Sequence, residues 1–432
     1  MSDSPFTSVI SQHLPDLTPY ESLYKHFHRN PEISTLETET NARILSELQT
    51  LNSAHNSPIE IKSPIGTTGL IGIHRNGDGP TILLRADIDG LPILEKTGLE
   101  YASTKRMMDT HLDNIEKPTM HACGHDFHIT CMLAAIETLL NCAEAWSGTL
   151  IYLFQPAEER GAGARMMLDD GLYTTHGCPK PDLCLGQHVF PFKAGNVYTR
   201  SGPTMSAADS YRITIYGKGG HGSMPHRCID PVVIASHIVV RLQTLVSREV
   251  PPDETAVVTV GSLKAGDTVN VIADEAVIQV NIRSVSEYWR KVLLDGLKRI
   301  VNAECEAGRA TKPATFHKLN EFPLCDNDED VTRRVQEGFT AYFGERHDPS
   351  MQPVLGSEDF PWLGSEIGKP YCFWFFGGVD GEEYERHVRE GTTNEIASNH
   401  SPFFAPCLQP TLRTGVEGMV VGALTFVGKE RK

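Results

Sequence analysis

The sequence lacks long apolar runs and closely spaced cysteines. No stretch approaches the roughly 18 consecutive apolar residues that a transmembrane helix needs, so we expect no membrane partner. The 10 cysteines are scattered over 432 residues without a C-x-x-C pair, which argues against a disulfide scaffold or a zinc ribbon. The N-terminal MSDSPFTSVISQHLPD has no basic start followed by an apolar run, so it does not resemble a signal peptide. These absences predict a cytoplasmic protein.

Basic residues are in the minority. The chain has 39 Lys and Arg against 55 Asp and Glu, for a formal net charge of −16. Because nucleic-acid binding requires a basic face, we expect no nucleic-acid partner. The sequence also lacks a G-x-S-x-G elbow, and Ser357 in GSEDF has no such flanking pattern. The sequence therefore does not predict a serine hydrolase.

Apolar strands alternate with helical patterns in the first part of the chain. TILLRADIDGLPI (81–93), GTLIYLFQPAEE (148–159) and DLCLGQHV (182–189) are typical of buried strands that end in polar residues. MHACGHDFHITCMLAAIETLL (120–140) begins with polar residues and glycine and continues as a helix. Strands that alternate with helices predict an α/β domain with a mostly parallel sheet.

The pattern changes near residue 204. SYRITIYGK, AVVTVGSL and EAVIQVNIRS predict strands. One helix follows the first strand and an amphipathic helix follows the third, in a compact β-α-β-β-α unit. The α/β pattern returns after about residue 317. We therefore predict an α/β protein in which a mixed-sheet catalytic α/β/α sandwich (1–203 and 317–432) is interrupted by a ferredoxin-like α+β lid or dimerisation domain (204–316).

Cys123 and His125 flank a glycine in Cys123-Gly124-His125-Asp126. A thiolate and an imidazole one residue apart can reach the same metal if the backbone turns sharply, and Gly124 permits such a turn. Asp126 could orient a ligand histidine. Taken alone, the motif also fits a loop with a buried cysteine and a surface histidine.

Further metal-capable side chains follow other strands. Glu158 and Glu159 end the strand at 148–155, where one carboxylate can bind metal and the other can accept a proton from water. An acidic helix start is the simpler alternative for such a pair. His188 follows the next strand, and His400 lies in the loop Asn399-His400-Ser401-Pro402. Together these donors suit Zn²⁺, with Mn²⁺, Co²⁺ or Ni²⁺ also possible.

A series of motifs resembles the M20 metallopeptidases, specifically the amidohydrolase subgroup with hippurate hydrolases, N-acyl-amino-acid deacylases and indole-acetyl-amino-acid hydrolases. The resemblance covers roughly residues 20–430. The motifs occur in the family's order: FHRNPEIS, LLRADIDGLPI, MHACGHDFH, QPAEERGAGA, GQHVFP, GKGGHGSMPH, NVIAD, GSEDF and NHSPFF. Each motif is weak alone, but the ordered set is specific.

The resemblance implies two divalent metal ions, Zn or Mn foremost. Cys123 would bridge them, Glu159 and His400 would complete one site, and His125 and His188 the other. Glu158 would be the general base. Many M20 peptidases carry H-x-D after the early strand, where this chain has Arg85-Ala86-Asp87. His125 replaces that ligand in the subgroup, so we do not expect Asp87 to bind metal.

The resemblance also assigns residues in the insert. His221 in GKGGHGSMPH would stabilise the oxyanion in the active site of a partner subunit, which implies a homodimer. Asn270 and Arg283 would bind the substrate carboxylate, since an arginine offers paired N–H donors. The implied reaction cleaves an N-acyl-amino acid, a small-molecule substrate, to a carboxylic acid and a free amino acid.

Two alternatives remain open at this point. The same scaffold could carry a carboxypeptidase or dipeptidase with nearly identical chemistry. A degenerate, non-catalytic binder of acyl-amino acids is the rival from another class, although the six ligand and base positions are filled. The segment STKRMMDTHLDNIEKPT (103–119) is longer than the subgroup leads us to expect, so it could cover the mouth of the site and alter substrate choice.

Overall fold

The computed structural model describes residues 5–55 and 59–429, which form two compact units. The first unit comprises residues 1–202, 327–352 and 359–432, and the second comprises 203–326 and 353–358. The chain passes between them within β9 (Gly202–Met205) and β16 (Cys325–Asn327). Among the described residues, no helix has the length and apolar character needed to cross a membrane.

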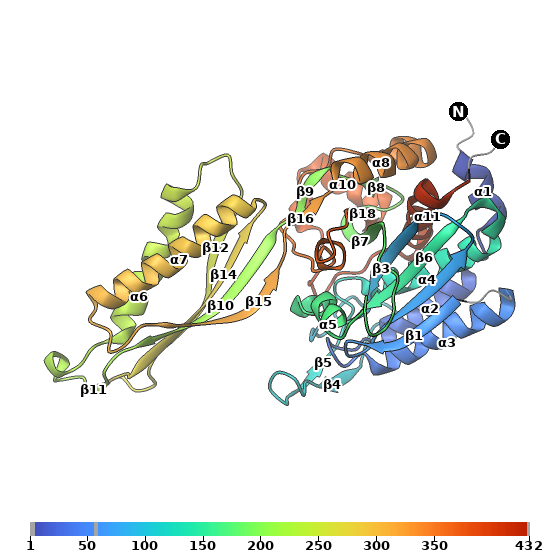
Figure 1. Ribbon diagram of the computed structural model, residues 1–432. Coiled ribbons are helices and arrows are strands. Elements are labelled where there is room, and N and C mark those ends of the chain that lie inside the picture. Colours follow the sequence, from blue (N-terminus) through green and yellow to red (C-terminus); the bar gives the residue numbers. More distant parts are fainter. Residues whose placement is uncertain (1–4, 56–58, 430–432) are drawn as a thin grey trace. The chain divides into compact units, whose positions relative to one another are not determined.

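A mixed sheet forms the centre of the first unit (Figure 1). Its strands, in spatial order, are β1 (Ile59–Ile65), β2 (Gly69–Asn76), β6 (Gly148–Gln155), β3 (Thr81–Asp87), β7 (Leu183–Lys193), β18 (Tyr371–Val379), β8 (Val197–Tyr198) and β17 (His347–Asp348). The central strands β6, β3, β7 and β18 run parallel, while β1, β2 and β6 pair antiparallel. The carboxyl ends of β3, β6 and β7 therefore lie along one edge, where ligands bind in open α/β sheets.

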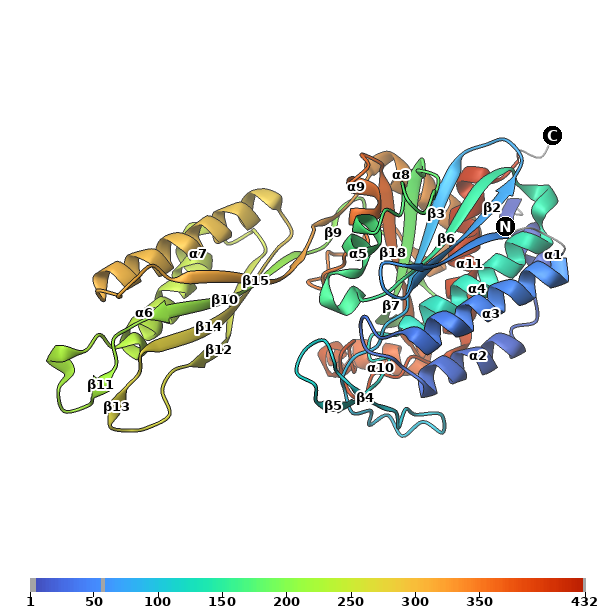
Figure 2. The ribbon, with the colours of Figure 1, turned by 60° about the horizontal axis from the view of Figure 1, so that its bottom comes forward.

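Helices cover both faces of this sheet (Figure 2). The larger group is α1 (Pro5–His13), α2 (Thr18–Arg29), α3 (Thr38–His55), α4 (His125–Asn141), α8 (Glu329–Phe343) and α11 (Leu408–Val427). The other face carries α5 (Gly163–Asp169) and α9 (Trp362–Ser365), and α10 (Gly381–Glu390) follows β18. The core includes Leu84, Phe127, Tyr152 and Trp374, which are buried where strands meet helices. The predicted α/β sandwich with a mixed sheet is confirmed.

The second unit has the β-α-β-β-α-β order of a ferredoxin-like fold. Its elements are β10 (Ala207–Tyr216), α6 (Pro231–Thr244), β12 (Ala256–Lys264), β14 (Glu275–Ser284), α7 (Glu287–Ala307) and β15 (Thr315–Phe322), with a small β11–β13 ribbon (Gly220–His221 and Val271–Ile272). Alternate residues of β14 are buried against the helices, which explains its alternating sequence. The strand order is β12-β14-β10-β15.

The second unit extends further along the chain than the boundary at 316 predicted from the sequence. β15 pairs antiparallel with β10, so it belongs to this sheet, and the unit ends after Asp326. The sequence of β15, TFHKLNEF, is mostly polar and carries no strong strand pattern. Its pairing with β10 in the folded protein is what identifies it as a strand of this sheet.

The remaining strands form a small hairpin in the first unit. β4 (Arg106–Met108) pairs antiparallel with β5 (Glu116–Pro118), and the two make a separate two-stranded sheet. This hairpin, residues 103–119, is the segment that the sequence singled out as unusually long.

Candidate metal centre

A glycine turn places Cys123 and His125 together. Gly124 has φ +84°, a left-handed conformation, and a Cβ there would lie 2.3 Å from Val189 Cγ1. Because no other residue fits this turn without displacement, glycine is required. Cys123 immediately precedes the turn, and His125 opens α4 immediately after it. Both side chains are buried.

His125 presents one ring nitrogen to the centre of the site. Its Nδ1 lies 3.2 Å from Asp89 Oδ1, whereas its buried Nε2 has no hydrogen-bond partner among the residues that the structure describes. This Nε2 lies 3.5 Å from Asp87 Oδ2 and 3.8 Å from Glu159 Oε1. Burial opposes protonation, but the carboxylates of Asp87 and Asp89 outweigh it and raise the pKa of His125 to about 10. Nε2 is thus surrounded by negative charge that a cation would neutralise.

His188 is held as a neutral imidazole. It lies in β7, and its Nδ1 is 2.7 Å from the Val189 carbonyl oxygen, to which the ring N–H donates. Its Nε2 lies 3.5 Å from Cys123 Sγ. Burial holds the pKa of His188 well below its usual value. A ring whose Nδ1–H is bound to a carbonyl has an Nε2 lone pair ready for a metal.

The two glutamates follow β6 through a strained turn. Ala157, just before Glu158, has φ +49°, and its N–H donates to Glu37 Oε1 at 2.8 Å. A non-glycine residue in this region costs roughly 1–3 kcal/mol and occurs mostly at functional sites. Glu158 Oε2 lies 3.9 Å from His125 Nε2. The turn therefore aims both carboxylates at the same histidine.

Glu159 connects the buried ligands to His400. Its Oε2 is 3.2 Å from His400 Nε2, while its buried Oε1 has no hydrogen-bond partner within residues 5–55 and 59–429. His400 also has a left-handed backbone, with φ +68°, and its N–H donates to the Ala122 carbonyl at 2.8 Å. Its side chain is 55% exposed, so it borders the site from the solvent side.

The donor set fits transition-metal ions. One donor atom each from Cys123, His125 and Glu159 lie within 4.8 Å of one another. In these residues His125 Nε2 and Glu159 Oε1 are buried without a hydrogen bond from the described part of the chain, which is costly unless a cation binds them. Burial, with Glu159 second, raises the pKa of the Cys123 thiol well above its usual value, so thiolate formation there needs a positive ion. Thiolate, imidazole and carboxylate are donors that Zn²⁺ and similar ions accept.

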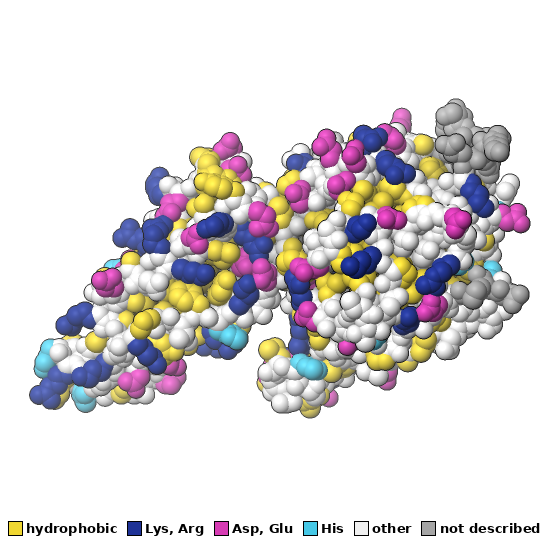
Figure 3. Space-filling model, viewed as in Figure 1, with side chains coloured by type: hydrophobic (Ala, Val, Ile, Leu, Met, Phe, Trp, Pro, Cys, Tyr) yellow, Lys and Arg dark blue, Asp and Glu magenta, His cyan; other side chains and the backbone are white. Residues whose placement is uncertain are grey.

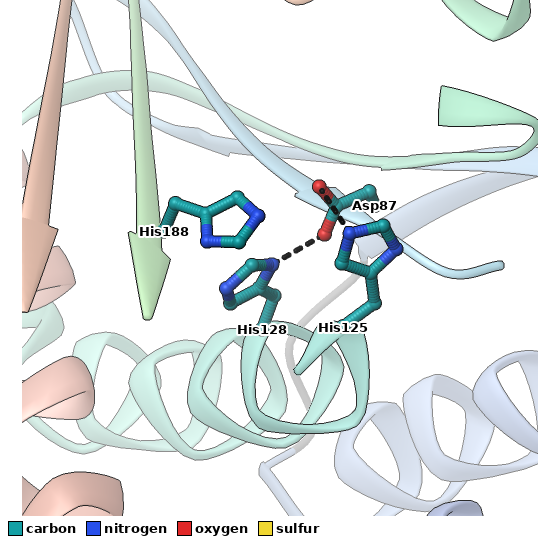
Figure 4. A group of neighbouring side chains, drawn as sticks. All are labelled: Asp87, His125, His128 and His188. Carbon is teal, nitrogen blue, oxygen red and sulfur yellow. Dashed lines mark hydrogen bonds and ion pairs between the residues drawn. The ribbon is translucent and has the colours of Figure 1, made fainter. Parts of the chain in front are cut away.

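Figure 4 shows a second grouping, of Asp87 from β3, His125 and His128 from α4, and His188 from β7. Here the hydrogen bonds indicate which residues are supports. His128 Nδ1 binds Asp87 Oδ1, and its Nε2 accepts the Val189 N–H at 2.9 Å. Both ring nitrogens of His128 are therefore used, which leaves no lone pair for a metal. Its role is to hold Asp87 and the backbone of β7 in place.

Arg85 and Asp87 occupy the place of the family's H-x-D motif. The fully buried Arg85 donates from Nη1 to Asp87 Oδ2 at 2.7 Å and from Nε to Gln155 Oε1 at 2.9 Å. Burial disfavours the charged form of Asp87. Arg85 and the neighbouring histidines nevertheless hold the pKa of Asp87 well below its usual value. The two carboxylate oxygens of Asp87 therefore bind Arg85 and His128.

The carboxylate that orients His125 is Asp89, which the sequence did not single out. Asp89 Oδ2 also accepts the Glu159 N–H at 3.1 Å and the Ser34 hydroxyl at 2.6 Å. The proposed orienting role of Asp126 was wrong. The Asp126 side chain instead binds His28 Nδ1 at 2.7 Å and accepts a hydrogen bond from the Phe127 N–H. The only sequence signal for Asp89 is its spacing, two residues beyond Asp87.

Asn399 is a further support that the sequence did not identify. Its amide nitrogen donates to the Cys123 carbonyl at 3.1 Å and to the Val189 carbonyl at 3.2 Å, and it lies 3.7 Å from Cys123 Sγ. It thereby joins the loop of His400 to the thiol.

The three remaining predicted residues lie in the second unit. His221 is exposed on the β11–β13 ribbon, and Asn270 is exposed beside it, where its carbonyl accepts the Gly222 N–H at 2.8 Å. Arg283 lies on β14, where its Nη1 donates to the Leu355 carbonyl at 2.6 Å. Burial lowers the pKa of Arg283.

Comparison with known families identifies the chain. The family model described as peptidase family M20/M25/M40 matches residues 83–396. The chain belongs to this M20 family. It is 36% identical over 382 residues to the N-acetyl-L-cysteine deacetylase of Bacillus subtilis, covering 88% of this chain and 85% of the relative. It is 33% identical over 344 residues to the hippurate hydrolase of Campylobacter jejuni, covering 79% and 84%.

A solved M20 structure supports the metal centre. The YXEP protein of Bacillus subtilis, described as a dinuclear metal-binding peptidase of the M20 family, matches with TM-score 0.72 at 27% identity, over 94% of this chain and 97% of that chain. Family membership and these relatives confirm the resemblance and make the chain an M20 hydrolase. The ligand-like cluster and the dinuclear neighbour together support two metal ions.

Proposed function

We propose that the protein is a binuclear metal-dependent amidohydrolase that cleaves N-acyl-amino acids to a carboxylic acid and a free amino acid. The observation that carries the proposal is the buried trio Cys123, His125 and Glu159, with two unsatisfied donor atoms and the Glu158 carboxylate beside them. The substrate class follows the named activities of the similar deacetylase and hippurate hydrolase.

In this proposal Cys123 would bridge two cations, Zn or Mn foremost, with Co or Ni as alternatives. Glu159 and His400 bind one, and their side chains already approach to 3.2 Å. His125 and His188 bind the other, each through the Nε2 that its Nδ1 contact leaves available. When bound, such a pair of ions lowers the pKa of water and polarises a carbonyl.

Glu158 is the proposed general base. Its carboxylate lies beside the ligand cluster but is not needed to complete either ligand set, so it can take a proton from water and pass it to the leaving amine. The turn at Ala157, whose N–H donates to Glu37, fixes the position of the Glu158 carboxylate that receives this proton.

His221 is the proposed oxyanion donor. Its Nδ1 accepts the Ser223 N–H at 3.1 Å, and a backbone N–H can only donate, so a neutral ring carries its proton on Nε2. An exposed Nε2–H suits a developing oxyanion. Asn270 and Arg283 are proposed to bind the substrate α-carboxylate. The Nη2 of Arg283 has no hydrogen bond within the described chain, so that edge is available.

We further propose a homodimer through the second unit, in which His221 serves the partner's site. Support comes from α6, whose outward face exposes Val232, Val233 and Val240 at 40%, 53% and 70%. An apolar helix face of this kind favours contact with another protein surface. Light scattering of the purified protein measures the mass and tests this point separately.

The deciding experiment measures release of free amino acid from N-acyl-amino acids by protein loaded with Zn²⁺ or Mn²⁺. We expect turnover with metal, none after chelation, and about two metals per chain by elemental analysis. A dipeptide is assayed in parallel. Faster turnover of the dipeptide than of every acyl-amino acid would contradict the proposal and favour a dipeptidase. Tight binding without turnover would favour a non-catalytic binder.

A further inference from the structure

The exposed large hydrophobic residues of the first unit are not scattered. Among its described residues they are Leu94, Met108, Leu112, Ile115, Val388 and Phe403. All except Val388 lie on three segments: the loop after β3, the 103–119 hairpin and the loop of His400. Leu112 is 72% exposed, Ile115 58%, Phe403 56% and Leu94 55%. Single exposed apolar residues are ordinary, but such a concentration indicates a binding surface.

Each of the three segments is tied to the metal centre. Phe403 follows His400 by three positions in the same loop. The Lys96 N–H donates to the Pro402 carbonyl at 2.8 Å, which fastens the loop of Leu94 to that of Phe403. Phe403 therefore lies on the segment that carries a proposed ligand, and the loop of Leu94 is bonded to that segment.

A buried carboxylate, that of Asp109, connects the hairpin to the loop of the proposed base. Asp109, only 2% exposed, accepts Arg160 Nη2 at 3.0 Å on Oδ1 and Lys117 Nζ at 3.0 Å on Oδ2. Arg160 directly follows Glu158 and Glu159. Removing either partner would leave this buried carboxylate incompletely paired, which costs more than losing one member of a surface ion pair. The turn of the hairpin is thereby fixed to the strand-end loop that carries the proposed base.

The turn itself is ordered by local bonds around Asp109. Its N–H donates to the Ile115 carbonyl at 3.0 Å, and its Oδ1 also accepts the Leu112 N–H at 3.1 Å. Leu112 and Ile115 are therefore presented by a folded turn, and their exposure does not come from an unstructured loop. The hairpin projects from the first unit, with hydrophobic side chains on its surface (Figures 1 and 3).

We propose that Leu94, Met108, Leu112, Ile115 and Phe403, here called the apolar rim, bind the acyl portion of the substrate and select longer aliphatic acyl groups over acetyl. This inference rests on the proposed function. In that function the α-carboxylate is bound by Asn270 and Arg283 of the second unit, so the acyl portion, on the other side of the scissile bond, is left to the first unit. On the hairpin, Arg106 pairs with Glu116 at 2.9 Å and Lys117 pairs with Asp113 at 2.8 Å, which suits an uncharged ligand.

The test measures kcat/KM for one amino acid carrying acetyl, butanoyl, hexanoyl, octanoyl or decanoyl groups, with the metal-loaded full-length protein. We expect kcat/KM to rise by up to about fourfold for each added methylene that contacts the rim, then to level off. Hydrolysis of none of these substrates would overturn the proposed function itself. Hydrolysis with acetyl preferred would overturn only the rim.

Variants then assign the preference to particular residues. Leu112→Ser and Ile115→Ser should each lower the octanoyl-to-acetyl ratio of kcat/KM by about tenfold, the lower end of discrimination by apolar contacts. Val388→Ser on α10 is the matched control, an exposed apolar residue of the same unit outside the rim, and should leave the ratio unchanged. All three positions are exposed, so the variants should fold, and circular dichroism checks this.

Two outcomes would refute the assignment. One is an equal fall for every chain length, because a rim that merely shapes the site would affect acetyl and octanoyl substrates alike. The other is a change of mass in solution for the Leu112 and Ile115 variants with an unaltered chain-length profile. That result would make the rim a protein interface.

Discussion

Replacing Asp89 by asparagine tests how the centre is organised. The two oxygens of Asp89 accept three donors: His125 Nδ1 at 3.2 Å, the Ser34 hydroxyl at 2.6 Å and the Glu159 N–H at 3.1 Å. Asparagine retains one oxygen and adds an N–H₂ group, so at least one donor must face another donor. Asp89→Asn therefore loosens both a ligand ring and a ligand backbone. Loss of such a supporting partner typically weakens metal binding by 10–100-fold, about 1.4–2.8 kcal/mol.

The assay is competition for Zn²⁺ between the protein and a chromophoric chelator, followed by kcat on protein saturated with metal. We expect weaker binding and a smaller loss of kcat at saturation. Ser34→Ala is the matched control, since it removes only the hydroxyl donor to Asp89 and should change affinity by less than about threefold. Asp126→Asn is the second comparison and should leave metal affinity in the folded protein nearly unchanged, because Asp126 binds His28. If Asp126→Asn weakened zinc binding more than Asp89→Asn did, the reasoning would fail.

Four further predictions concern the base, the turn, pH and the metals. Glu158→Gln should keep both metals yet lower kcat by about 10²–10⁴-fold, and full activity with both metals bound would rule out the base assignment. Gly124→Ala should destabilise the fold by at least about 1–2 kcal/mol in urea unfolding, since φ is +84° and the new Cβ would overlap a valine methyl; an unchanged midpoint would contradict this. Burial opposes charge on His28, but hydrogen bonds to Asp126 and Glu95 raise its pKa to about 9, above the ordinary 6.5. That contribution, up to about 3 kcal/mol, is present below pH 6.5 and lost as pH rises through 9, so the free energy of unfolding should fall over this range by more in the wild type than in His28→Gln, in which the raised pKa of His125 still contributes. Chelation should lower the melting temperature because buried donors lose their cation, and zinc should restore it; a melting temperature unaffected by chelation would argue against a buried site.

The predicted ligands come together because each has a local cause. Cys123 and His125 flank a glycine whose turn nothing else fits, and Glu159 and His188 lie where strands of one sheet reach the same edge. Strand alternation and the paired helices likewise predicted the ferredoxin-like insert up to its last strand. β15 was not predicted because none of its residues is buried, so burial imposes no alternating pattern on its sequence.

Supporting residues were harder to predict. Asp87, Asp89 and Asp126 are all carboxylates near the motifs, and no sequence pattern distinguishes which one faces His125. His128 stands three residues from His125 on the same helix, yet the Val189 N–H and Asp87 use both of its nitrogens. Such roles depend on hydrogen bonds between residues tens to hundreds of positions apart.

The sequence by itself determined the family, the mixed α/β fold, and a set of metal-capable side chains in a fixed order, because short motifs record local turns and strand ends. Only the tertiary structure decided that Asp89 orients His125, that His188 holds its proton toward the Val189 carbonyl, and that Asp109 of the hairpin pairs with Arg160 beside the proposed base. The physical reason is that protonation, tautomer and orientation are set by neighbours in space, and those neighbours are distant in the chain.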